Sequence, residues 1–177
     1  MAASDPTNTG DVLAGSNGAA GEGASADAPQ VAALAQYVKD LSVENPSAPQ
    51  VYQWNEQPQL DVQFNIAVNK IADEVHEVVL KIDASARSAS GVHFVLDLSY
   101  GGIFGLRNLP EEALAPFLLV EAPRLLFPFA RQVVASSTQD AGFPPLMLDP
   151  IDFAAIYMAQ VQQQQAGEQP QGEPTIQ

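Results

Sequence analysis

Residues 92–100 read VHFVLDLSY, and this stretch decides the fold because its apolar side chains recur at every second position. Alternate side chains of an extended strand point to opposite faces. One face would carry Val92, Phe94, Leu96, Leu98 and Tyr100, and the other would carry His93, Val95, Asp97 and Ser99. The pattern predicts a strand with one buried face and one wet face, and the following Gly101-Gly102 pair permits a bulge or the close approach of another group.

Three upstream segments have the same character. They are 34–44 (LAQYVKDLSVE), 60–66 (LDVQFNI) and 75–86 (VHEVVLKIDASA). In the first of them, the wet face would carry Asp40, Ser42 and Glu44, and the other face Lys39, Leu41 and Val43. The stretch between the first two segments, NPSAPQVYQWNEQP (45–58), holds three prolines and predicts a long irregular connection.

The period changes after Leu109, and the rest of the folded chain reads as helix. Pro110 followed by two glutamates is typical of a helix start. Further prolines at 116, 123 and 128 are expected to interrupt this helix, which leaves 128–140 as its uninterrupted part. A last helix should begin at Asp149 or Asp152 and run to about residue 165. Strands followed by helices predict an α+β fold with a four-stranded antiparallel sheet and two C-terminal helices.

The two ends of the chain differ in composition from the middle. Residues 1–30 are rich in small and polar residues and contain four acids without a Lys or Arg. They hold too few large apolar side chains to offset the entropy of ordering, and 166–177 (AGEQPQGEPTIQ) reads the same way. We therefore expect a disordered acidic tail at 1–30, one folded domain at 31–165 and a second disordered tail at 166–177.

Charge and composition exclude several functions. The 177 residues include 7 Lys and Arg against 21 Asp and Glu, a formal net charge of −14. So acidic a chain is not expected to bind nucleic acid or an anionic membrane surface. No apolar run of 18 residues and no basic start followed by an apolar stretch is present, so we expect neither membrane insertion nor a secretory signal. The absence of cysteine excludes disulfides and fits a reducing compartment.

Catalytic and metal-binding patterns are also missing. The two histidines, His76 and His93, lie on separate predicted strands without a second metal ligand at a suitable spacing. The glycine-rich GGIFG (101–105) lacks the lysine of a phosphate-binding loop, and no serine lies in a nucleophile motif. We therefore expect no enzyme activity, no metal and no cofactor.

Two features remain, and each permits two interpretations. Acids on the wet strand faces, Asp40, Glu44 and Asp97 beside Val95, either keep the sheet soluble or form a docking site for a basic partner. The rings and prolines outside regular structure, such as Tyr52, Trp54, Phe143 and Pro144-Pro145, exceed what a small sheet can cover. Some belong to the core, and the others indicate a groove for apolar chain segments or a subunit interface.

Taken in order, several segments resemble the SecB-type protein-export chaperones. The resemblance lies in YVKDLSVENPSAP (37–49), IADEVHEVVLKI (71–82), YGGIFGL (100–106), PRLLFPFARQVVAS (123–136) and GFPPLMLDPIDFAAIYMAQ (142–160). It implies a sheet in Greek-key order, with first and last strands adjacent, and a homotetramer built as a dimer of dimers. It also implies a cytoplasmic chaperone that holds unfolded precursor proteins and passes them to the SecA ATPase.

The resemblance also implies which residues form the binding sites, by their positions in the matching segments. The resemblance gives the SecA-docking role to Asp40, Glu44, Val95 and Asp97, where Asp97 replaces the glutamate common in the family. The 46–59 connection and the last helix are expected to line grooves for unfolded polypeptide with Tyr52, Trp54, Phe143, Phe153, Ile156 and Tyr157. The connecting-loop tryptophan usually stands directly before Gln-Pro, but that position is Glu56 here and the ring is Trp54. The alternative function is a small acidic adaptor that binds folded partners.

Overall fold

The computed structural model describes residues 28–167 and contains one antiparallel sheet with helices on one side. The strands are β1 (Gln30–Glu44), β2 (Gln59–Ala72), β3 (Val75–Ser88) and β4 (Gly91–Arg107). Their order in the sheet is β1-β4-β3-β2, so the first and last strands lie side by side as expected. The predicted tails at 1–30 and 166–177 fall almost entirely outside the described residues.

All four predicted strands are present, but each is longer than its alternating core. β4 shows why, because it continues through Gly101 and Gly102 and stays paired with β3 to Gly105 and with β1 to Arg107. The glycines carry no side chain to clash, and ladder hydrogen bonds on both sides hold the backbone extended. Of the two possibilities expected at this pair, the close approach is present, because the Tyr37 ring packs on Gly101. Register shifts lie between Ala33 and Ala35, between Val38 and Asp40, between Lys70 and Ala72, and between Ala86 and Arg87.

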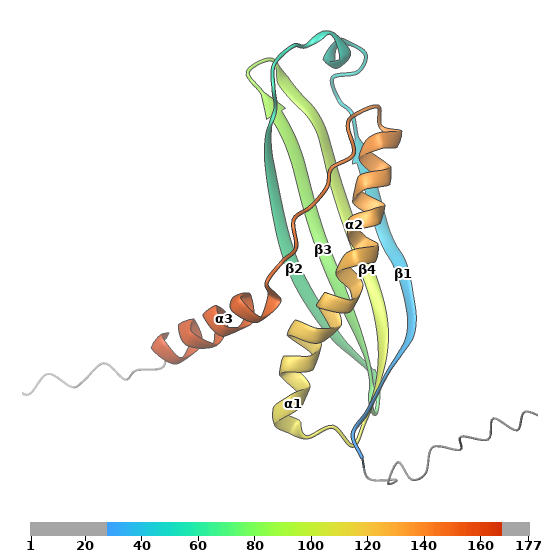
Figure 1. Cartoon of the computed structure of the whole chain (residues 1–177), viewed down its shortest axis with the longest axis vertical. Helices are drawn as coiled ribbons and strands as arrows, with labels where there is room; N and C mark the ends of the chain where they lie inside the picture. The colour runs from blue at the N-terminus through green and yellow to red at the C-terminus, as the bar shows by residue number, and fades with distance from the viewer. Residues whose placement is uncertain (1–27, 168–177) are drawn as a thin grey trace, which may run out of the picture.

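Helices cover only one face of the sheet. Figure 1 shows α2 (Ala122–Asp140) crossing this face, followed by an extended segment and then by α3 (Phe153–Gly167), which points away from the sheet. The core lies between α2 and the predicted apolar strand faces. Its fully buried side chains include Leu80, Ile82, Leu96, Leu98, Phe104, Leu126, Val134 and Phe153. No described element covers the opposite face of the sheet.

The expected interruption of the first helix by prolines is wrong. Helical structure runs without a break from α1 (Glu111–Pro116) through η2 (Phe117–Glu121) into α2. η2 is a π-helical turn, and the Ala122 N–H that follows it bonds to the Phe117 carbonyl. Pro123 directly follows this turn, and Pro128 lies further along α2. The π turn therefore separates Pro116 from the other two prolines, and the helical structure continues through all three.

By length and composition, residues 111–140 could also cross a membrane. The buried core helix of a soluble protein has the same properties. Here Leu126, Ala130 and Val134 recur at helical spacing and are fully buried in the core beneath the sheet. The apolar character of this helix is thus explained by packing on one side, whereas Leu125 and Phe129 on the other side remain about half exposed.

Candidate functional site

The four predicted docking residues lie together on the uncovered face of the sheet. In the β1–β4 ladder, Asp40 lies opposite Ser99, Ser42 opposite Asp97, and Glu44 opposite Val95. Asp97 therefore lies between the two β1 acids on the neighbouring strand. The three carboxylates are exposed and Val95 is half-buried. We call Asp40, Glu44, Val95 and Asp97 the acidic face.

Two further aspartates extend this face across the sheet. Asp83 on β3 lies opposite Asp97. Together with Asp61 on β2 they border a shallow hollow of about 250 Å³. A hydrogen bond with the Asp83 carboxyl, together with burial, raises the pKa of Asp97 above its ordinary value. Strand alternation alone places Asp61 and Asp83 on wet faces, but the lateral strand order was needed to bring them beside Asp97.

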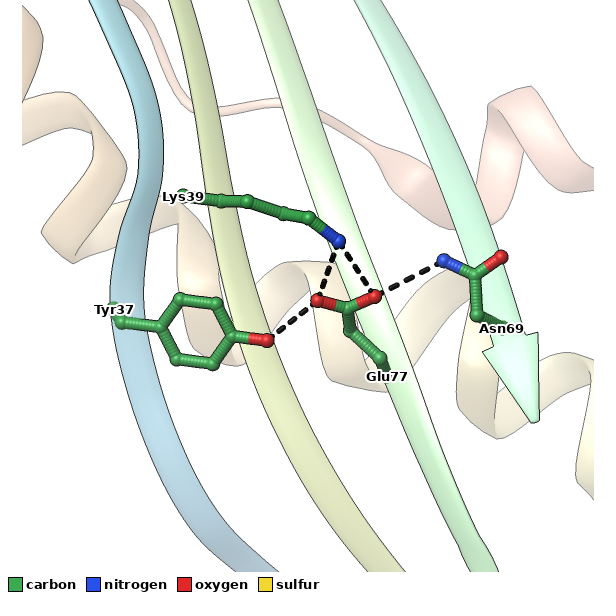
Figure 2. Close-up of polar contacts among 4 residues, drawn as sticks. All are labelled: Tyr37, Lys39, Asn69 and Glu77. Carbon is green, nitrogen blue, oxygen red and sulfur yellow. Dashed lines mark hydrogen bonds and ion pairs between the residues drawn. The ribbon is translucent and has the colours of Figure 1, made fainter. Parts of the chain in front are cut away.

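Closer to the other end of the same face, Glu77 forms the centre of a polar cluster (Figure 2). Its carboxylate accepts hydrogen bonds from the Tyr37 hydroxyl at 2.5 Å and from Asn69 Nδ2 at 3.0 Å. Lys39 Nζ lies 2.8 Å from both carboxylate oxygens. These donors, Lys39 first, lower the pKa of Glu77 to about 2, and the bond to Glu77 raises the pKa of Tyr37 to about 12.

The position of Lys39 in this cluster corrects the predicted strand phase. The sequence placed Lys39 with Leu41 and Val43, on the opposite face from Asp40. The register shift between Val38 and Asp40 inserts one residue into β1, and Lys39 consequently points to the uncovered face and reaches Glu77. Strict alternation therefore holds only from Asp40 onward.

On the helix side, an apolar hollow of about 390 Å³ opens at the end of the sheet near the 45–58 connection. We call it the aromatic pocket; its lining is Gln57, Pro58, Leu60, His93, Phe94, Phe143, Pro144, Pro145 and Leu146. The ring of Phe143 lies 5.2 Å from Phe94, 6.0 Å from Tyr52 and 6.4 Å from His93, centroid to centroid. The pocket thus offers several aromatic faces to an apolar group.

His93 was expected on the wet face, but it is buried in the wall of this pocket. The shift between Ala86 and Arg87 leaves His93 without a ladder partner, which releases it from the alternation of Val95 and Asp97. Its ring meets Trp54 edge to face at 5.0 Å, and its Nε2 lies 2.9 Å from Ser88 Oγ. His93 and Phe94 are therefore pocket residues that sequence reasoning missed.

Contacts at the pocket wall also explain why the tryptophan of the 45–58 connection is Trp54 and does not occupy position 56. Trp54 packs on His93 and over Gly91, while Glu56 accepts a hydrogen bond from the Ser90 N–H at 3.1 Å. That bond lowers the pKa of Glu56. The connection thus uses an aromatic contact and a carboxylate to hold the β3–β4 turn, and Trp54 supports the pocket wall from behind.

The six residues predicted to bind unfolded polypeptide fall into two places. Tyr52, Trp54 and Phe143 lie at or beside the aromatic pocket. The other three belong to α3 and border a small hollow of about 70 Å³, together with Phe64, Ile66 and Leu119. Tyr52 is exposed, whereas Trp54 and Phe143 are half-buried.

Phe153 differs from its two α3 neighbours. It is only 2% exposed, and its ring lies 6.1 Å from that of Phe127 within the core. Ile156 is 39% exposed and Tyr157 is half-buried, so both remain accessible at the hollow. The expectation of an accessible Phe153 is therefore wrong, because the first turn of α3 inserts this ring beneath the helix to anchor it.

A family model described as preprotein translocase subunit SecB matches residues 24–164. The chain belongs to the SecB family. Proteins named protein-export protein SecB include one from Zymomonas mobilis, which is 57% identical over 136 residues, or 77% of this chain and 83% of that protein. Another, from Erythrobacter litoralis, is 51% identical over 163 residues, covering 92% of this chain and 88% of that protein.

A solved structure supports the fold assignment. It is a SecB-like chaperone of Mycobacterium tuberculosis in complex with a ChAD peptide from the HigA1 antitoxin. The two folds superpose with a TM-score of 0.56 at 18% identity, over 70% of this chain and 90% of the other. Membership of the SecB family gives this chain a chaperone role in protein export.

Proposed function

We propose that this chain is an ATP-independent cytoplasmic chaperone that holds unfolded precursor proteins in a translocation-competent state and delivers them to the SecA ATPase. The observation that carries the proposal is the division of labour between the two sides of the sheet. Apolar hollows open on the helix side, and carboxylates gather on the uncovered side. The first surface suits the apolar segments of an unfolded chain, and the second suits a basic docking element.

Client binding would draw its free energy from burial alone. An apolar side chain that enters the aromatic pocket gains about 25 cal/mol per Å² of apolar surface removed from water. Each hollow is small, so a single contact is weak. Several such sites on one assembly would retain a long client by avidity after its first contact. This mechanism needs no nucleotide.

Docking of SecA would rest on charge. Asp40, Glu44 and Asp97 present three exposed carboxylates around half-buried Val95, a combination that suits a basic segment with one apolar contact. The attraction would be screened by salt because the carboxylates are exposed. The chain's net charge of −14 would also keep separate assemblies from associating through their open apolar pockets.

Assembly into a homotetramer, as a dimer of dimers, is supported by apolar surface outside the pockets. The edge strand β1 exposes Val31, Leu34, Val38 and Leu41, and the outer side of α2 exposes Leu125 and Phe129. Monomeric proteins rarely leave so much large apolar surface in contact with water. Closed symmetric association would cover it.

The decisive experiment is suppression of aggregation. The purified chain, without ATP, should keep a refolding precursor soluble at near-stoichiometric amounts, and sedimentation should show a complex of the tetramer with the client. A protein that binds only folded partners would leave aggregation unchanged. That result would favour the adaptor function and contradict the proposal.

A further inference from the structure

Lys39 has a position that conflicts with the role of its neighbours. It is the only Lys or Arg in β1, and it directly precedes Asp40 of the acidic face. A free ammonium group at this point would pair with nearby carboxylates and repel a basic partner. The structure instead directs the Lys39 side chain away, across β4, to Glu77 on β3 (Figure 2).

Glu77 is built to hold that ammonium group. Its side chain is only 10% exposed, and both oxygens contact Lys39 Nζ at 2.8 Å. Tyr37 from β1 and Asn69 from β2 donate to the same carboxylate from opposite sides. Donors from both edge strands thus fix the carboxylate in one orientation, and the ammonium that binds it is fixed as well.

The β1 bulge makes this contact possible. Without the extra residue between Val38 and Asp40, strand alternation would direct Lys39 and Asp40 to opposite faces. With it, Lys39 lies on the uncovered face beside Asp40, where its charge would matter most. The arrangement therefore places the Lys39 ammonium group next to the acidic face and pairs it with the Glu77 carboxylate.

We propose that Glu77 is a positioning residue for the acidic face, which holds the Lys39 ammonium group away from Asp40 and so leaves the docking carboxylates uncompensated for a basic partner. The inference rests on the proposed function, because it takes the acidic face as the SecA-docking surface. It goes further in giving a role to two residues outside that surface. A purely structural cluster would stabilise the edge strand without affecting affinity.

The test compares three variants of the full-length chain by calorimetric titration with SecA. Glu77→Gln removes the anion and frees Lys39, so SecA affinity should fall about fivefold. The double variant Lys39→Gln/Glu77→Gln has the same net charge as the original chain and lacks the free cation, so its affinity should return to within about twofold of the original. Lys39→Gln alone should bind SecA at least as tightly as the original chain.

Several outcomes would overturn the inference. They are unchanged affinity in Glu77→Gln, a double variant as weak as Glu77→Gln, or weaker binding by Lys39→Gln. Thermal unfolding and client binding, measured on the same samples, verify that each variant is folded. The Lys39→Gln variant keeps the test decisive if Glu77→Gln is too unstable. Asp40→Lys, measured in parallel, separates the two ideas, since unchanged SecA binding there would contradict the docking surface itself.

Discussion

The ring of Tyr37 lies on the backbone of Gly101, so closely that a Cβ on residue 101 would be 2.8 Å from Tyr37 Cε2. Gly101 lies opposite Tyr37 in the β1–β4 ladder. The absence of a side chain on β4 gives the Tyr37 ring a flat path across the strand to Glu77 on β3. A glycine in the middle of a strand is thus explained by the close approach of a neighbouring ring.

Replacement of Gly101 by alanine should therefore destabilise the fold. The added methyl group would push the Tyr37 ring away and loosen the hydrogen bond to Glu77, at a cost of about 1–3 kcal/mol in the free energy of unfolding. Gly105→Ala on the same strand is the matched control, because a Cβ there meets only Leu34 at 3.6 Å. Urea denaturation of both variants checks this, and equal stabilities would contradict it.

Acid should weaken the fold through Glu77. Its pKa is lowered in the folded state from 4.5 to about 2, so its stabilising contribution is complete above pH 4.5 and is lost as the pH falls towards 2. The difference in unfolding free energy between the original chain and Glu77→Gln should shrink between pH 5 and pH 2.5. A difference that stays constant over this range would show that the carboxylate is not responsible.

Charge reversal on the acidic face should affect docking alone. Asp40→Lys or Asp97→Lys should weaken SecA binding at least tenfold at low salt, because each replaces an attraction with a repulsion. Client binding should not change. Asp140→Lys makes the same change in net charge on an exposed position of α2 and should bind SecA normally. Loss of SecA and client binding together would disprove the separation of the two surfaces.

Truncation inside the aromatic pocket should affect clients. Phe143→Ala removes the ring that contacts Phe94, Tyr52 and His93, and should weaken client binding several-fold without dissociating the proposed tetramer. Met147→Ser, at an exposed position next to the pocket lining, serves as control. Client titration and size-exclusion chromatography are the measurements. Dissociation of the tetramer by Phe143→Ala would assign this ring to assembly instead.

Neighbouring positions of α3 should behave differently. Phe153→Ala empties a fully buried site and should cost about 3–5 kcal/mol of stability, with detachment of α3 as a consequence. Ile156→Ala, one turn later and 39% exposed, should cost less than about 1 kcal/mol and reduce client binding only. Thermal unfolding distinguishes the two variants, and similar losses would contradict the assignment of Phe153 to the core.

The sequence predicted the strands and the buried face correctly because alternation is strong where packing is one-sided. Phe94, Leu96 and Leu98 lie in the core as their spacing indicates. Its errors lie at Lys39 and His93, next to two of the four register shifts in the sheet. The shift at Lys39 also brings Tyr37 to the uncovered face, and neither shift bears a local sequence signal such as a glycine at the inserted residue.

Contacts between neighbouring strands are the second feature that the sequence pattern alone did not predict. Alternation showed that Asp40 and Asp97 are each on a wet face, but only the resemblance to a known family indicated that their strands are neighbours. Asp83 was not connected to either, because its place beside Asp97 depends on the β3–β4 register. The prolines of the long helix do not end it, and the π turn between Pro116 and Pro123 has no recognised sequence pattern.

The extended segment between α2 and α3 has a mechanical consequence. Its first residues, 143–146, form a wall of the aromatic pocket, and its last lead into Phe153, which borders the hollow under α3. One short strap of backbone therefore frames both cavities and is tethered by buried Leu148 midway. Because Leu148 is buried between the two cavities, the position of this segment against the core defines one wall of the aromatic pocket and the entry into α3 at the same time.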